Sequence, residues 1–174
     1  MSAAPLAPAD PMARTVDFIV AGDPRQLTGG YVYDAQVVEQ LRRLGWTVDV
    51  HGLPGRFPEA DDIARSALDD TLARLPAGRP VVMDGLALGG LPEVALAHGR
   101  RLQLVALVHH PLADESGLDP VRRRCLLASE RAALAAARRV IATSPFTARR
   151  LADVGGSAAR LRVVEPGVTR MPAA

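Results

Sequence analysis

The chain alternates between short apolar runs and segments in which apolar residues recur every three or four positions. The first pattern is typical of buried strands and the second of helices packed on one side. The predicted strands cover residues 16–21, 46–50, 80–83, 102–108, 139–143 and 161–165. The predicted helices cover residues 31–44, 60–75, 92–98 and 120–137, and a last one begins at residue 145. This alternation predicts an α/β fold, a doubly wound, mostly parallel sheet with helices on both faces.

Local signals mark several helix ends. Gly45 follows the first helix and suits a C-terminal stop. Asp119 with Pro120, and Ser144 with Pro145, each place a capping side chain before a proline at the first helical position. We therefore expect helices to begin at these two places.

The same patterns predict which positions are buried. Leu102–Val108 is the most apolar run, so we expect a central strand buried on both faces. We also expect Ile63 on the buried side of its helix, Cys125 in the core, and Asp84–Gly90 as a loop. The single cysteine excludes an internal disulfide and a metal site built on cysteines.

Composition narrows the classes of partner. With 174 residues the chain suits one domain, and 48% hydrophobic but only 3% aromatic residues predict a core of Ala, Leu, Val and Ile. The chain has no lysine, so its basic side chains are arginines, and the formal net charge is only +2 despite a pI of about 9.3. A nearly neutral protein gives no reason to expect nucleic-acid binding.

The chain divides into one domain and two tails. Residues 1–14, rich in Ala and Pro, predict a disordered N-terminal tail, residues 15–168 the domain, and residues 169–174 a C-terminal tail. The start lacks the pattern of a signal peptide, and no stretch approaches the roughly 20 apolar residues of a membrane span. We therefore expect no transmembrane segment and a cytoplasmic location.

Candidate chemistry gathers in four loops. In doubly wound sheets, ligands bind beyond the carboxyl ends of the strands. The segments 22–30, 84–90 and 109–117, together with Thr143–Ser144, all fall at that edge. Their convergence predicts a ligand site there.

The loop Thr28-Gly29-Gly30 leads directly into a helix. The unpaired amides of a helix start attract anions, and glycines allow a phosphate or sugar to approach the backbone closely. The loop lacks both the G-x-G-x-x-G and the G-x-x-x-x-G-K-[ST] pattern, so we do not predict NAD or ATP binding. The alternative is a tight turn without a ligand.

Histidines and an aspartate end two of the strands. His109 and His110 follow the apolar run, and a neutral imidazole both donates to and accepts from a substrate hydroxyl; a structural role is the alternative. Asp84 would orient a ligand hydroxyl or cap a turn. These histidines, together with His51 and His98, lack metal-ligand spacing such as H-E-x-x-H, so we predict no metal.

Several segments together resemble the N-terminal half of family-4 retaining glycosyltransferases of the GT-B type, over about residues 14–168. They are Thr28–Asp34, Gly45–Val48, His109–Leu112, Glu130 with Arg139–Ser144, and Val163–Val168. The resemblance implies a Rossmann-like domain, one half of a GT-B enzyme, that binds mainly the acceptor. The cleft between the two halves would hold the active site.

The resemblance also implies the reaction and its residues. A sugar would pass from a nucleotide-sugar to an acceptor hydroxyl with retained configuration, without metal and with no cofactor beyond the nucleotide-sugar co-substrate. The family histidine that contacts the transferred sugar matches His109 or His110, and we prefer His109 as the catalytic residue because it directly follows Val108. Loops matching Gly29 and Gly30 approach the donor diphosphate or the acceptor. The remaining residues expected to bind donor or acceptor are Thr28, Asp84, His110 and Ser144.

The family crosses to its donor-binding domain near Pro166–Val168, whereas this chain ends at Ala174. We therefore expect the donor-binding domain to be absent and the chain to be inactive alone. The chain would be either a truncated domain or one that works with a partner, a separate donor-domain chain or a second copy in a homo-oligomer. The alternatives are a non-catalytic binding or interaction module that kept the fold, and a free-standing small-molecule enzyme with an unrelated doubly wound fold.

Overall fold

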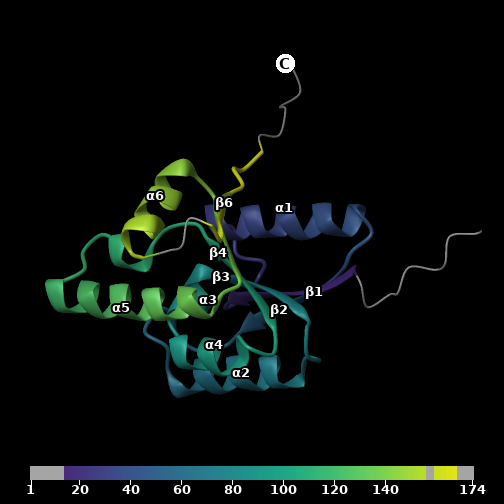
Figure 1. Ribbon diagram of the computed structural model, residues 1–174, viewed down its shortest axis with the longest axis horizontal. Helices are drawn as coiled ribbons and strands as arrows, with labels where there is room; N and C mark the ends of the chain where they lie inside the picture. Colours follow the sequence, from purple (N-terminus) through teal and green to yellow (C-terminus); the bar gives the residue numbers. More distant parts are fainter. Residues whose placement is uncertain (1–13, 156–158, 168–174) are drawn as a thin grey trace, which may run out of the picture.

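The fold is one six-stranded sheet between layers of helices (Figure 1). The computed structural model describes residues 14–155 and 159–167. The strand order is β2-β1-β3-β4-β5-β6, and every neighbouring pair is parallel. The strands are β1 (Thr15–Ala21), β2 (Thr47–Leu53), β3 (Pro80–Asp84), β4 (Gln103–Val108), β5 (Arg139–Ala142) and β6 (Leu161–Val163). The predicted α/β class with a parallel sheet is confirmed.

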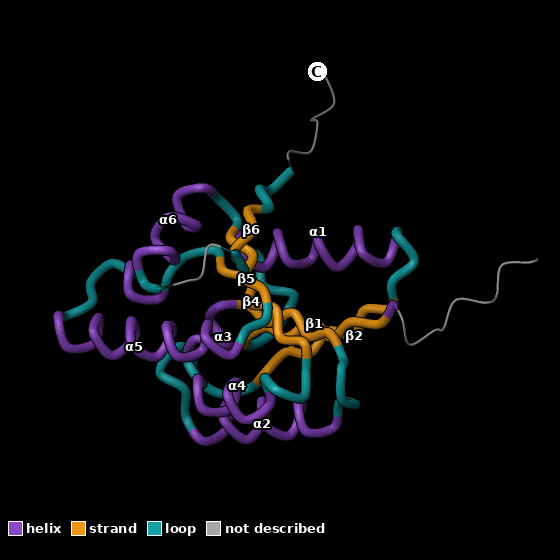
Figure 2. The backbone as a smooth tube through the Cα atoms, viewed as in Figure 1, coloured by secondary structure: helices purple, strands orange, loops and turns teal. Residues whose placement is uncertain are grey.

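Helices cover both faces of the sheet, with α1 on one side and α2 and α4 on the other (Figure 2). The helices are α1 (Gly29–Arg43), α2 (Asp62–Arg74), α3 (Gly85–Gly89), α4 (Pro92–His98), α5 (Pro120–Ala136) and α6 (Pro145–Asp153), with a 3-10 turn at Leu112–Asp114. Alternate side chains of β1 point to opposite faces of the sheet. Phe18 and Val20 pack under α1, whereas Ile19 and Ala21 join the larger core beneath α2 and α4. All seven residues of β1 are buried, and its second half, Phe18–Ala21, is an uninterrupted apolar run.

The predicted helix caps are present. Asp119 accepts hydrogen bonds from the amides of Val121 and Arg122 ahead of α5. Ser144 accepts from the Thr147 amide ahead of α6. Gly45 ends α1 with a φ of +84°, a conformation that favours glycine.

Three sequence expectations were wrong. The segment Asp84–Gly90 contains α3, whose five residues are too few to show a helical period, and Asp84 caps it by accepting from the Leu86 amide. Ile63 is 61% exposed because Ala64, Leu68 and Leu72 form the buried face of α2. Cys125 is exposed. Its neighbour Leu126 and, one turn on, Glu130 take the buried positions of α5.

The tails predicted for residues 1–14 and 169–174 lie, apart from Arg14, outside the described residues. Across residues 14–155 and 159–167, no helix combines the length and the apolar character needed to cross a membrane.

Candidate functional site

A cavity of about 230 Å³ opens at the carboxyl edge of the sheet, between the start of α1 and the ends of β3 and β4. Its lining includes five of the residues that the sequence predicted for a site. They are Thr28, Gly30, Asp84, His109 and His110. The expectation that ligands bind beyond the strand ends therefore coincides with a hollow surface.

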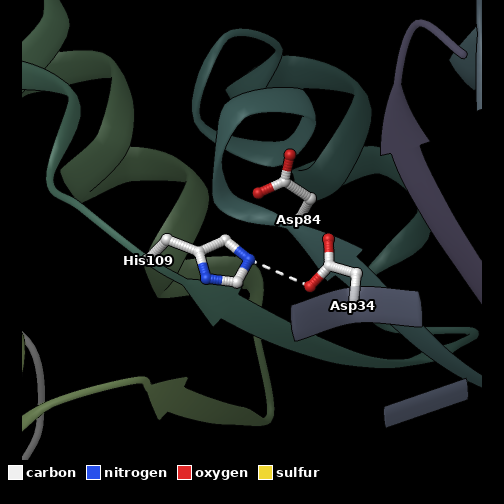
Figure 3. A group of neighbouring side chains, drawn as sticks. All are labelled: Asp34, Asp84 and His109. Carbon is white, nitrogen blue, oxygen red and sulfur yellow. Dashed lines mark hydrogen bonds and ion pairs between the residues drawn. The ribbon is translucent and has the colours of Figure 1, made fainter. Parts of the chain in front are cut away.

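His109, Asp34 and Asp84 all line this cavity, and their side chains are neighbours (Figure 3). The His109 Nε2 atom lies 2.9 Å from Asp34 Oδ1, and one ligand-type atom from each of the three residues falls within 4.8 Å of the others. The Asp34 side chain is 7% exposed and the His109 side chain 22% exposed. The imidazole is thus fixed at one nitrogen while part of the ring still faces solvent.

Gly30 makes room for the imidazole. A Cβ atom at this position would lie 3.2 Å from His109 Cδ2, closer than ordinary contact. The ring of Tyr33 meets the imidazole edge-on, with centroids 5.3 Å apart. The Thr147 hydroxyl donates to the His109 carbonyl oxygen at 3.1 Å, so α6 fixes the backbone of the same residue.

The charges in this cluster influence one another. Burial raises the pKa of Asp84 to about 6, and the negative charge of Asp34 adds to this rise. Burial disfavours the charged form of His109, yet the hydrogen bond to Asp34 and the charges of both aspartates outweigh it and raise the pKa of the imidazole. The pKa values of Asp84 and His109 are thus both raised above their ordinary values, and a carboxyl with a pKa of about 6 beside an imidazole suits hydrogen bonding to hydroxyls and proton transfer.

Two predicted residues lie elsewhere. A Cβ atom added at Gly29 would meet no atom within 4 Å, and Gly29 lines a separate groove between α1 and residues 164–167. Ser144 caps α6 and does not line the cavity. Its hydroxyl instead lies 2.9 Å from the Thr147 hydroxyl, which contacts the His109 backbone.

Sequence reasoning assigned no role to Asp34 or Glu130. Asp34 occupies a buried position of α1, one turn before the buried Val38, and a carboxylate on an apolar helix face is the sequence signal that could have identified it. Glu130 is 2% exposed and accepts the Leu112 amide at 3.2 Å, which ties α5 to the loop after β4. Burial raises the pKa of Glu130 to about 7.

Metal binding was not expected from sequence spacing. Asp34, Asp84 and His109 come from three separate segments, so a search for metal-ligand spacing along the chain does not detect them. Their side chains nevertheless lie close enough for one cation to contact all three. The absence of a metal stays a prediction.

The family model of Glycosyltransferase Family 4 matches residues 28–170. No curated protein matches the chain. The family match covers most of the chain and includes every residue that lines the cavity. The chain belongs to glycosyltransferase family 4.

Proposed function

We propose that this chain is the acceptor-side domain of a retaining glycosyltransferase. The acceptor binds in the cavity at the carboxyl edge of the sheet, and a second domain holds most of the nucleotide-sugar. The observation that carries this proposal is the His109 imidazole, which Asp34 holds at 2.9 Å inside a cavity of a family-4 chain.

In the proposed reaction, the acceptor oxygen forms a bond to the anomeric carbon while the bond from that carbon to the diphosphate oxygen breaks. The proton of the acceptor hydroxyl passes to the leaving diphosphate. His109 hydrogen-bonds the sugar hydroxyls at the reacting face. Asp34 holds the imidazole in its orientation before the sugar binds, so the ring does not have to reorient during the reaction. Asp34 is in this sense a positioning residue.

The remaining predicted residues take supporting roles. Thr28, Asp84 and His110 line the cavity and offer hydrogen-bonding groups to a sugar. Gly29 and Ser144 act from outside it, Gly29 beside the neighbouring groove and Ser144 through the hydroxyl of Thr147.

The test is transfer of a labelled sugar from a panel of nucleotide-sugars, with the chain alone and with candidate donor-binding domains added. His109→Ala is expected to lower the transfer rate of the active mixture by a factor on the order of 100 or more, because an oriented proton-transfer or hydrogen-bonding group contributes that much. Circular dichroism is expected to show an unchanged fold.

His98→Asn is the matched control, because His98 also pairs with an aspartate, Asp69 at 2.7 Å, but lies outside the cavity. It is expected to retain transfer. Full activity of His109→Ala would remove the catalytic role. Acceptor binding without transfer in every mixture would instead identify a non-catalytic binding module.

A further inference from the structure

We propose that the acceptor bound in this cavity carries a protonated amine beside its hydroxyls, as an amino sugar or an aminocyclitol does, and is not a phosphorylated compound. This inference rests on the proposed function, because it names the substrate class of the same cavity.

The charged groups that line the cavity are unbalanced. Three carboxylates, those of Asp34, Asp84 and Glu115, line it together with His109 and His110, and no arginine does so among the described residues. Arginine nevertheless supplies all 21 strongly basic side chains of the protein. Asp114, which precedes the cavity residue Glu115 in the chain, differs from the cavity carboxylates because it is paired with an arginine, Arg150, at 2.6 Å.

Two of these carboxylates are buried side by side. Asp84 is 6% exposed and Asp34 is 5% exposed, and each feels the negative charge of the other through a poorly screened interior. His109, with its Nε2 atom 2.9 Å from Asp34 Oδ1, compensates at most one of the two negative charges. A second positive charge is therefore favourable in this place, and an ammonium group supplies it with charge-assisted hydrogen bonds. A phosphate group would be repelled.

The size of the cavity favours a small ligand. Pockets for drug-sized molecules measure roughly 300–1,000 Å³. The cavity here has about 230 Å³. It therefore suits one ring with its substituents, which places the amine and the hydroxyls of a single sugar or cyclitol within reach of Asp34 and Asp84.

The test measures binding to the chain alone by two-dimensional amide NMR at pH 7.5. The probes are glucose, glucose 6-phosphate, glucosamine and 6-amino-6-deoxyglucose, which vary the charge on one ring. At least one amino sugar is expected to bind about tenfold more tightly than glucose, and glucose 6-phosphate more weakly than glucose. The amides of Gly30, Gly85 and His109 are expected to shift, because these residues line the cavity.

Asp84→Asn separates charge from shape. Asparagine keeps an oxygen for the Leu86 amide but removes the charge, so the ratio of amino-sugar affinity to glucose affinity is expected to fall to less than threefold. Asp69→Asn, outside the cavity, is expected to keep the full preference. In the unaltered protein the preference is expected to shrink as pH falls below 6, where Asp84, which is surrounded by Tyr31, Asp34 and His109, takes up a proton.

Three outcomes overturn the inference. Equal binding of glucose and both amino sugars at the cavity overturns the amine preference and leaves the proposed function standing. Tighter binding of magnesium or manganese chloride than of any sugar, with the same amides shifted, identifies a cation site instead. Shifts confined to other surfaces with every probe overturn the inference and the proposed function together.

Discussion

Two buried aspartates, one on β1 and one on α1, each pair with a histidine, and they differ in the other charged groups beside them. Toward the start of β1, Asp17 lies 2.7 Å from His51 Nε2 and 3.1 Å from the Arg79 Nε atom. At the carboxyl edge of the sheet, Asp34 holds His109 at 2.9 Å, and the neighbouring group is a second carboxylate, Asp84. The first pair has the positive charge of Arg79 beside it, whereas the second has a further carboxylate, that of Asp84.

Under the proposed function, this difference separates a structural pair, Asp17 with His51, from a functional one, Asp34 with His109. Asp17 is 2% exposed, and the arginine compensates its charge within the protein. Asp34 and Asp84 border a cavity, so the compensation is left to a proton or to a ligand. A histidine beside an aspartate is therefore uninformative until the remaining charges are counted.

Arg79→Ala is the change with the largest expected effect. It leaves the carboxylate of Asp17 buried without its cation, which typically costs about 3–5 kcal/mol of unfolding free energy. Urea unfolding at pH 7 measures the loss. Arg25→Ala is the control, because its ion pair with Asp23 is exposed, and its urea midpoint is expected to stay nearly unchanged. Equal midpoints for both variants would show that Asp17 does not need the arginine.

Asp84→Asn is expected to act in the opposite direction. The pKa of Asp84 is about 6 in the folded protein against an ordinary value of 3.8, so the folded state binds the proton more tightly and stability falls as pH rises from 4 to 6. Asparagine removes this loss. We expect a gain of about 1–3 kcal/mol at pH 8 and none at pH 4, on the order of the shift in pKa.

Urea unfolding of both proteins at pH 4, 6 and 8 measures this gain. A loss of stability at pH 8 would show that the aspartate charge at position 84 supports the fold. The surroundings of Asp17 and of Asp34 would then both stabilise the protein, and the contrast between the two pairs would be lost.

Gly30→Ala has the smallest expected effect on stability. Alanine favours a helix by up to about 1 kcal/mol relative to glycine. At position 30 its methyl group would meet His109 Cδ2, whereas at position 29 it would meet no atom within 4 Å. We therefore expect Gly29→Ala to be neutral or slightly stabilising and Gly30→Ala to displace the imidazole, which the NMR shifts of the His109 ring report. Unmoved ring signals in Gly30→Ala would contradict the assigned role of Gly30.

Much of the fold was accessible from the sequence because burial on both faces leaves a readable pattern, as β1 and β4 show. Element ends were less accessible. β2 continues to Leu53 because its pairing with β1 continues, with Val20 opposite Gly52 and Ala21 opposite Leu53, and such pairing is not contained in a local pattern.

The site was accessible only in part. His109 and Asp84 end strands, so topology alone brings them to one edge. Asp34 was missed because its contact with His109 joins residues 75 positions apart. Gly30 was expected to admit a ligand, and here it admits a side chain of the protein itself.

Tyr33 connects the His109 imidazole to β6, the last strand of the sheet. Its hydroxyl donates to the Val164 carbonyl oxygen at 2.8 Å, just after β6, while its ring borders the His109 imidazole. Tyr33 thus bridges two segments that are far apart in the chain, the backbone just after β6 and the imidazole of His109. The position of that imidazole therefore depends on the last strand of the sheet as well as on α1 and β4.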